Sequence, residues 1–500
     1  MAVNTWDGAV STDWNDAGNW NTTGITDRVP TSADDVIIPN TSSLNNPTLS
    51  ATGGNPKNVN SLEIQANGTI VGGGIAIRVY GENSNGYAVD NDGIIDGGST
   101  LHLIIKTDTT TALDLNGTSG SFTNVEIDHA SCVAQLAENA SILGTLTITA
   151  GEFDTASDRD LTVAGDVSVT GTLTGNASAI EFNSLTIAAA GTYSATSGVT
   201  TLTGEKDYWA LDVADGGTFA HNSGTVTVTT NTNTFIRGME GDDTSGSGAN
   251  ALNDLTVNLG AAGYRLELRP IGSGITAHNI VGDVIVTRGL FYQETDAHTL
   301  TIGGDVTVQA NGTLGKSSIS GNNSFGSLTI ESSGEYIATS GTTTITDKTS
   351  SGNYSLDNQG TFTSNGGTLK VTGDGGHIRE QGNGSIHNLV VDLGGSSEVH
   401  KLSDSTTITG NLTITEGHFQ PNGRNLTVEG LVTNNDTFTA SSGVMSFGGI
   451  RTQGTGFTGA GTVNILGTGA IIEGNLDDSN VVINLDSALL FDGTNDSVDC

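Results

Sequence analysis

The sequence is poor in the residues from which compact domains build dense cores and disulfide frameworks. Of 500 residues, 6 are proline and 2 are cysteine, and aromatic residues make up 5%. The two cysteines, Cys132 and Cys500, are too few for a disulfide-rich secreted domain and show no metal-binding spacing. Collagen is excluded because proline is scarce and no Gly-X-Y period exists. The remaining composition, with 71 glycines and many Thr, Ser and Asn residues, favours a long repeat array.

Two kinds of targeting segment are also missing. No apolar run reaches the roughly 18 residues of a transmembrane helix, so we expect no membrane insertion. The start, Met1–Trp6, has neither the basic nor the apolar region of a secretory signal peptide. Such a start fits a protein released by cell lysis, or a chain trimmed of its signal.

Positive charge is scarce as well. Lys and Arg number 17 against 54 Asp and Glu, which gives a net charge of -37 at pH 7. A surface of this kind repels phosphate backbones and anionic membranes, so we expect no nucleic-acid partner. The simplest interpretation of the charge is that it keeps a long, thin protein soluble.

A long internal repeat runs through the chain. The segment 182–198 returns at 325–341 with 11 of its 17 residues identical, an offset of 325 − 182 = 143. Shorter matches, such as a Leu-Thr-Ile triplet followed by Gly and then Phe, indicate a third copy. We therefore predict three related blocks, at 122–251, at 252–385 and, shortened, at 386–486.

The pattern within each block predicts strands. Apolar residues alternate with Thr and Ser over about five to eight residues, between Gly, Asn-Gly and Ser-Gly turn signals. Thin cores of Val, Ile, Leu and Ala without visible linkers favour an all-β fold, a right-handed parallel β-helix (solenoid) built from about three long super-repeats. Tandem β-sandwiches are the alternative. Coils of roughly 20 residues that each rise about 4.8 Å would give a rod on the order of 100 Å long.

The N-terminal segment 1–40 differs from the repeats. It holds three of the four tryptophans, in the order Trp…Asn-Trp…Val-Pro…Asp-Asp-Val-Ile-Ile. This order resembles the solenoid-starting segment of many bacterial and phage β-solenoid surface proteins. The resemblance implies that residues 1–40 form a cap over the open end of the core, followed by an N-terminal β-solenoid at 41–121. A sugar-stacking aromatic platform is the alternative. The residues that carry the cap prediction are Trp6, Trp14, Trp20, Pro30, Asp34 and Asp35.

The last residues, 487–500, include the run Leu-Leu-Phe-Asp-Gly-Thr-Asn-Asp-Ser-Val. This run resembles the opening strand of laminin-G-like jelly rolls, although Ser497 stands where that pattern prefers an aromatic residue. The resemblance implies either the start of a truncated jelly-roll domain or a lone strand with the same motif. If the chain continued past Cys500, a carbohydrate-binding tip would follow.

Acidic residues supply weak candidates for metal binding. Asp90, Asp92 and Asp96 offer oxygen ligands for calcium, but their run lacks the glutamate that closes an EF-hand loop. Turn formation is a sufficient explanation for them, as it is for the acidic pairs at 242–243 and 477–478. Calcium is therefore the one cofactor that the sequence admits, and we predict no catalytic residue.

Arginine is rare, yet Ile-Arg recurs near the end of each block, at Arg237, Arg379 and Arg451. We interpret these arginines as anchors that hold a coil corner through carbonyl groups or an acid. A ladder of ligand-reading side chains is the alternative. The nine histidines show no metal spacing, and no nucleophile or phosphate-loop motif is present.

The composition and architecture resemble the Thr/Gly/Asn-rich β-solenoid repeat proteins of phage virions and bacterial surfaces. The resemblance implies a non-enzymatic structural fibre or appendage protein, in first place a tail or capsid fibre of a phage virion that acts as a stiff spacer or host-contact element. A bacterial surface adhesin or extracellular filament and a polysaccharide depolymerase are the alternatives. We expect self-association into a fibre or virion assembly and multivalent contact with a host-surface glycan or protein. The expected location is the virion, or alternatively the cell surface.

Overall fold

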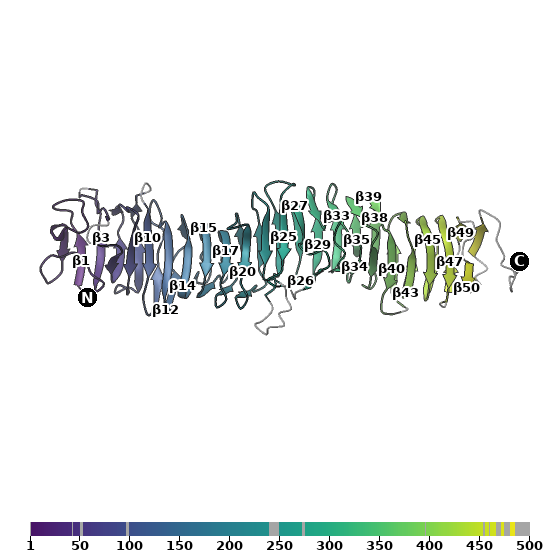
Figure 1. Ribbon diagram of the computed structural model, residues 1–500, viewed down its shortest axis with the longest axis horizontal. Coiled ribbons are helices and arrows are strands. Elements are labelled where there is room, and N and C mark those ends of the chain that lie inside the picture. Colours follow the sequence, from purple (N-terminus) through teal and green to yellow (C-terminus); the bar gives the residue numbers. More distant parts are fainter. Residues whose placement is uncertain are drawn as a thin grey trace. The chain divides into compact units, whose positions relative to one another are not determined.

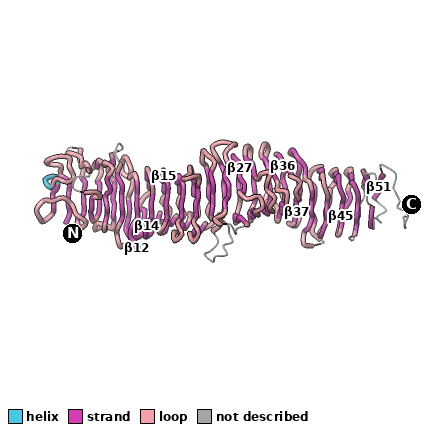
Figure 2. Tube along the Cα trace, in the orientation of Figure 1, coloured by secondary structure: helices cyan, strands magenta, loops and turns pink. Residues whose placement is uncertain are grey.

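The computed structural model describes residues 2–42, 44–50, 54–96, 100–239, 250–272, 276–395, 397–453, 456–459, 461–466, 472–474 and 481–485. The chain divides into two units, Met1–Asp254 and Leu255–Cys500, and each is described by itself. Among the described residues no helix is long and apolar enough to cross a membrane. The one short helix of the described part is a 3₁₀ turn, η1 (Ala17–Asn19), drawn in cyan in Figure 2.

Short strands make up most of the first unit. In chain order they are β1 (Ala2–Trp6), β2 (Trp20–Thr22), β3 (Asp34–Ile38), β4 (Lys57–Val59), β5 (Ser61–Ile64), β6 (Thr69–Ile70), β7 (Ile75–Val79), β8 (Tyr87–Asn91), β9 (Ile94–Ile95), β10 (Leu101–Ile105), β11 (Thr110–Leu113), β12 (Asn124–Leu136), β13 (Ala140–Ile142), β14 (Leu146–Asp154), β15 (Leu161–Val169), β16 (Thr172–Thr174), β17 (Ile180–Ile187), β18 (Thr192–Ser194), β19 (Val199–Leu202), β20 (Trp209–Val213), β21 (Thr218–Ala220), β22 (Thr225–Val228) and β23 (Thr234–Arg237).

The strands of the second unit continue the same pattern, after β24 (Asp254–Asn258) at the division. They are β25 (Arg265–Arg269), β26 (Ala277–Ile280), β27 (Val284–Gln293), β28 (Thr299–Ile302), β29 (Asp305–Val308), β30 (Gly312–Leu314), β31 (Asn323–Phe325), β32 (Ser327–Ile330), β33 (Glu335–Ile337), β34 (Thr342–Ile345), β35 (Tyr354–Asn358), β36 (Thr361–Thr363), β37 (Thr368–Val371), β38 (His377–Glu380), β39 (Asn383–Ser385), β40 (Asn388–Asp392), β41 (Val399–Leu402), β42 (Thr406–Ile408), β43 (Leu412–Glu416), β44 (His418–Gln420), β45 (Leu426–Asn434), β46 (Thr437–Ala440), β47 (Met445–Thr452), β48 (Gly456–Gly459), β49 (Gly461–Ile465), β50 (Ile472–Gly474) and β51 (Val481–Leu485).

In the middle of the first unit a typical strand pairs with strands one coil earlier and one coil later. Val167 of β15 lies opposite Leu185 of β17, and Leu185 lies opposite Leu211 of β20. The coil from Leu185 to Leu211 is therefore longer than the coil from Val167 to Leu185. Figure 1 shows these three strands side by side. Their pairing is parallel, and among the described strand pairs only β1 with β2 is antiparallel. The predicted all-β parallel solenoid is thus confirmed, and the tandem-sandwich alternative, which needs antiparallel sheets, is wrong.

A coil in the middle of the first unit contributes three strand segments. The two halves of β17 supply the first two segments and β18 supplies the third. The strands β19, β20 and β21 stack on these segments in the same order. The chain thus returns to each face once per coil, and a residue that points inward lies against its counterpart in the next coil.

Alternation of apolar and polar residues places the core inside this stack. Leu185, Leu211 and Ile236 occupy the same register in three consecutive coils, and each is fully buried. In the second unit Leu328 and Leu356 occupy the matching register and are also fully buried. Burial of one such side chain contributes about 1.5–3 kcal/mol, so these ladders of aliphatic residues are the main stabilising element of each unit.

The sequence repeat is also a repeat of contacts. The hydroxyl groups of Tyr193 and Thr200 are 2.7 Å apart, and those of Tyr336 and Thr343 are likewise 2.7 Å apart. Both tyrosines are completely buried, and they hold the same place in the matching segments 182–198 and 325–341. Copies of the repeat in the two units therefore share internal packing as well as sequence. The predicted block boundaries at 121/122, 251/252 and 385/386 remain predictions.

Candidate functional site

The three N-terminal tryptophans gather into one buried cluster. The ring centroid of Trp20 lies 5.0 Å from that of Trp6 and 4.7 Å from that of Trp14, both edge-on. The indole N–H of Trp20 donates to the carbonyl oxygen of Trp14 at 2.9 Å. None of the three side chains is more than 1% exposed. Their ring faces are therefore closed to a sugar, and the cluster packs the end of the first unit.

The other predicted cap residues have separate surroundings, and Asp34 and Asp35 of β3 lie opposite Ala2 and Val3 of β1. Pro30 is buried. Asp34 is completely buried and forms an ion pair with Arg28. Asp35 accepts a hydrogen bond of 2.7 Å from the hydroxyl of Ser61 in the next coil. Each carboxylate therefore has a structural partner, one within the cap segment and one in the solenoid.

The candidate calcium residues do not form a metal site in the described part of the chain. Asp90 is half-buried on β8, whereas Asp92 and Asp96 are exposed. Burial raises the pKa of Asp90, and the nearby Asp92 and Glu63 carboxylates raise it further. No group of three or more His, Cys, Asp or Glu residues within the described ranges is arranged to hold a metal ion. The acidic pairs at 242–243 and 477–478, Cys500 and the segment 487–500 lie outside the described residues.

Arg237 is the centre of a compact polar and aromatic group, which we name the first arginine site. Arg237 lies opposite Asp212 of the preceding coil and forms an ion pair with it. Its Nη2 donates to Asp212 Oδ2 at 3.0 Å. The guanidinium carbon lies 4.7 Å from the ring centroid of Trp209, and Phe235 packs edge-on against Trp209 at 5.5 Å. One cation is thus held by a carboxylate and an aromatic face together.

Arg379 is the centre of the corresponding group in the second unit, the second arginine site. Arg379 lies opposite Asp357 and donates from Nε to Asp357 Oδ1 at 2.6 Å. Its guanidinium carbon lies 4.3 Å from the ring of Tyr354, and His377 takes the place that Phe235 has in the first site. The bond to Asp357 raises the pKa of Arg379. Both sites join neighbouring coils, which is the arrangement that an anchor of a coil corner requires.

Arg451 belongs to a different environment. It lies on β47, between Thr433 of the preceding coil and Glu473 of the following one. The structure therefore brings two of the three predicted arginines into matching sites, and it places the third at a strand position where threonine and glutamate are the register partners.

The two arginine sites differ most in the turn that precedes the aromatic residue. In the first site, Lys206 and Trp209 form reciprocal backbone hydrogen bonds of 3.0 and 2.9 Å around a two-residue turn. The turn residues, Asp207 and Tyr208, have φ values of 52° and 76°. Tyr208 is 64% exposed. In the second site the turn is longer, and an exposed Asn353 with φ of 58° precedes Tyr354.

Sequence reasoning did not find the partners of the arginines. Trp209, Asp212, Tyr354 and Asp357 precede their arginines by roughly one coil, and such a separation carries no local signal. The recurrence of an aromatic residue three positions before an Asp, in Trp-Ala-Leu-Asp and Tyr-Ser-Leu-Asp, was the available clue.

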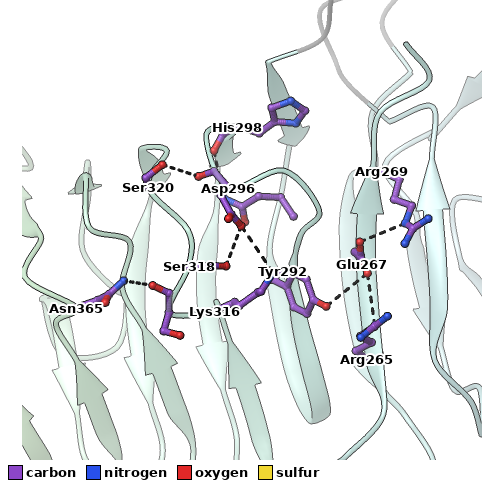
Figure 3. Close-up of polar contacts among 12 residues, drawn as sticks. Arg265, Glu267, Arg269, Tyr292, Asp296, His298, Lys316, Ser318, Ser320 and Asn365 are labelled. Carbon is purple, nitrogen blue, oxygen red and sulfur yellow. Dashed lines mark hydrogen bonds and ion pairs between the residues drawn. The ribbon is translucent and has the colours of Figure 1, made fainter. Parts of the chain in front are cut away.

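A third charged group lies at β25 and β27 in the second unit (Figure 3). Glu267 is 4% exposed, and Figure 3 shows it between Arg265 and Arg269 of its own strand. The Nε–Oε distances are 3.5 Å to Arg265 and 3.2 Å to Arg269. The hydroxyl of Tyr292 in the next coil donates to Glu267 at 3.5 Å. Burial and the Glu267 carboxylate raise the pKa of Tyr292, which keeps it a neutral donor. The group therefore neutralises a buried carboxylate and ties two coils together.

One groove of about 360 Å³ lies on an outer face of the first unit. It runs across β7, β10, β12 and β14, and its polar lining includes His102, Asn124, Glu126 and Thr145. Asn124 accepts from the backbone N–H of Thr145 at 2.8 Å and lies 2.7 Å from the His102 ring nitrogen. The groove is open and lined by hydrogen-bonding side chains, so it suits a polar chain more than an apolar ligand.

Comparisons with protein-family models, with curated proteins and with solved structures found no match for this chain.

Proposed function

We propose that this chain is a non-enzymatic structural appendage protein that acts as a stiff spacer and contact element, in first place as a fibre component of a phage virion. A bacterial surface adhesin or extracellular filament protein is the alternative with the same mechanism. The observation that carries the proposal is the continuous parallel pairing of coil upon coil, on three faces, in each unit.

Such a stack has the mechanical properties that a spacer needs. Each coil is hydrogen-bonded to two neighbours on several faces, so bending one coil against the next strains many backbone bonds together. The arginine sites add ion pairs between neighbouring coils, and the Glu267 group adds the hydrogen bond from Tyr292 of the next coil. The acidic surface, with 54 Asp and Glu against 17 Lys and Arg, keeps such a stack from unspecific association.

Immunogold electron microscopy of the particle or cell that carries this chain tests the proposal. We expect label along a projecting fibre on virions in a phage lysate. Label on the surface of uninfected bacteria would favour the adhesin alternative. Label confined to soluble protein that is free of both particles and cell surfaces would contradict the appendage proposal.

A polysaccharide depolymerase is a second candidate, because the groove across β7 to β14 places His102 and Glu126 in one polar lining. Incubation with capsular and algal polysaccharides tests it, with new reducing ends or unsaturated uronates as the readout. The non-enzymatic proposal expects neither product. Product formation that disappears in a Glu126→Gln variant, but persists in Asp212→Asn, would overturn it in favour of the groove.

A further inference from the structure

The turn of the first arginine site displays a bulky side chain where the backbone favours glycine. A two-residue turn with positive φ at both positions is of the type that normally contains Asn-Gly or Asp-Gly. Asp207 fits the first position, but Tyr208, with φ of 76°, takes the second. A bulky L-residue in the left-handed region is a genuine outlier, because its Cβ approaches the following carbonyl oxygen. Strained residues of this kind persist where the surrounding structure holds them in place, and they cluster at binding and active sites.

The fold itself uses the backbone of Tyr208 rather than its side chain. The carbonyl oxygen of Tyr208 accepts from the backbone N–H of Phe235 at 2.9 Å, and glycine would supply the same acceptor. The Tyr208 ring makes a tilted contact with Phe235, with 6.2 Å between the ring centroids. Most of the Tyr208 side chain is nevertheless exposed to solvent. In both sites we name the turn residue directly before the central aromatic residue the tip residue. In the second site it is Asn353, and asparagine tolerates positive φ. None of the described residues of that turn is an exposed aromatic.

The surroundings of Tyr208 combine aromatic and polar groups. Trp209 follows it directly and is partly exposed, with Arg237 stacked on its ring. Asp212 occupies two N–H groups of Arg237, and a guanidinium has five, so further donors remain for a ligand. The Arg237 side chain is 34% exposed and that of Asp212 is 15% exposed. The turn thus presents the Tyr208 ring at the surface beside the ion pair of Arg237 and Asp212.

We propose that Tyr208, Trp209, Arg237 and Asp212 form a binding site for a neutral glycan. The exposed Tyr208 ring offers a rigid apolar face for the C–H face of a sugar ring, while the guanidinium and the carboxylate pair with its hydroxyl groups. The ligand is neutral because Asp212 compensates Arg237, and because the net charge of -37 repels uronates and sulfates. This inference rests on the proposed function, since it names the ligand class of the contact element.

Affinity electrophoresis of the full chain in native gels that contain a polysaccharide measures the binding. The probes are a soluble glucan, a mannan and a galactan, with alginate as the anionic counterpart. We expect at least one neutral polysaccharide to retard the chain and alginate not to do so. Tryptophan fluorescence gives a local readout, because Trp6, Trp14 and Trp20 are buried and Trp209 is partly exposed. The retarding polysaccharide should shift the emission of Trp209.

Tyr208→Gly is the test variant and Asn353→Gly is its matched control. Both replace a tip residue of positive φ by the residue that suits this conformation, but only Tyr208 belongs to the proposed site. We expect Tyr208→Gly to weaken retardation about tenfold, equivalent to about 1.4 kcal/mol, and Asn353→Gly to leave it unchanged. Far-UV circular dichroism of both variants should match that of the parent chain.

Four outcomes would overturn the inference. They are the absence of binding to every neutral probe, equal or stronger binding to alginate, retention of full binding in Tyr208→Gly, and a shift of Tyr208→Gly from an oligomer to a monomer, which would assign the tip to a second copy of the chain. Electron microscopy decides the proposed function separately, because a chain found in virion fibres without glycan binding would refute only the site.

Discussion

The two arginine sites share their central contacts but differ in the exposed residue of the neighbouring turn. Each holds an arginine between an aspartate of the preceding coil and an aromatic ring, and each follows a tyrosine–threonine contact of equal length. These shared contacts are thus a property of the repeat. The exposed residue of the turn differs between the copies, because it is Tyr208 in the first site and Asn353 in the second. The difference separates what holds the coils together from what is available to a partner.

A repeat makes this separation visible because each copy serves as a control for the other. A side chain that recurs with its contacts, such as the aspartate opposite the arginine, has a structural explanation in both copies. A side chain that appears in one copy, against the backbone preference of its position, does not. We therefore assign the shared features to stability and Tyr208 to recognition, and the following substitutions test that assignment.

The largest expected effect comes from the shared core. Leu211→Ala and Leu356→Ala each remove a fully buried side chain from corresponding strands, β20 and β35. Each should lower the free energy of unfolding by about 3 kcal/mol, from lost burial and the cavity left behind. Denaturant unfolding measures both. A large effect in one copy and almost none in the other would break the claim that the two copies share their packing.

Loss of the aspartate–arginine ion pairs should have the next largest effect on stability, and the effect should differ between the two sites. Asp357→Ala should cost about 2 kcal/mol and Asp212→Ala about 1 kcal/mol, because Asp357 is 9% exposed and Asp212 is 15% exposed, and their arginines are 23% and 34% exposed. Thermal melts in low and high salt compare the two variants. If Asp212→Ala were the more damaging variant, burial would not set the strength of these pairs.

The buried hydroxyl contacts should give a similar or slightly smaller effect. Tyr336→Phe leaves Thr343 and Asn323 without their phenol partner, whereas Tyr193→Phe leaves Thr200. We expect costs of about 1.5 and about 1 kcal/mol. Equal melting temperatures for the parent chain and both variants would show that these contacts do not hold the coils.

Buried acids should make both units sensitive to pH. Burial raises the pKa of Asp114 in the first unit to about 6 and that of Glu380 in the second to about 7. The folded state holds these protons more tightly than the unfolded state does. Ionisation therefore destabilises each unit above the folded pKa, and this cost disappears as the pH falls below the unfolded pKa. Asp114→Asn and Glu380→Gln should each raise stability at pH 8 by on the order of 1 kcal/mol. Melting curves at pH 8 and pH 4 check this, and a gain that persists at pH 4 would contradict it.

The sequence was sufficient for the fold and for the existence of copies. Alternation of Val, Ile, Leu and Thr with glycine turns encodes strands locally, and the return of segment 182–198 at 325–341 encodes their recurrence. Parallel stacking follows because such thin apolar faces can be buried only against the next coil. The buried tryptophan cluster also lies in the segment that the pattern singled out.

The arginine sites could be predicted only in part. Arg237 and Arg379 stand out because arginine is rare, but their partners are a full coil away and coil length varies, so no fixed spacing identifies Asp212 or Asp357. Tyr208 carries no sequence signal at all. Tyr208 is a candidate binding residue because of its positive φ and its exposure. Both depend on a turn whose length differs between the copies.

The melting temperature of Tyr208→Gly, measured on the preparation used for glycan binding, is the most direct test of the assignment of Tyr208 to recognition. A residue displayed for recognition at the expense of backbone strain should give a melting temperature that is unchanged or higher after the substitution, together with weakened binding. A melting temperature several degrees lower, with binding to the neutral polysaccharide intact, would show that Tyr208 belongs to the scaffold and would contradict the distinction drawn between the two sites.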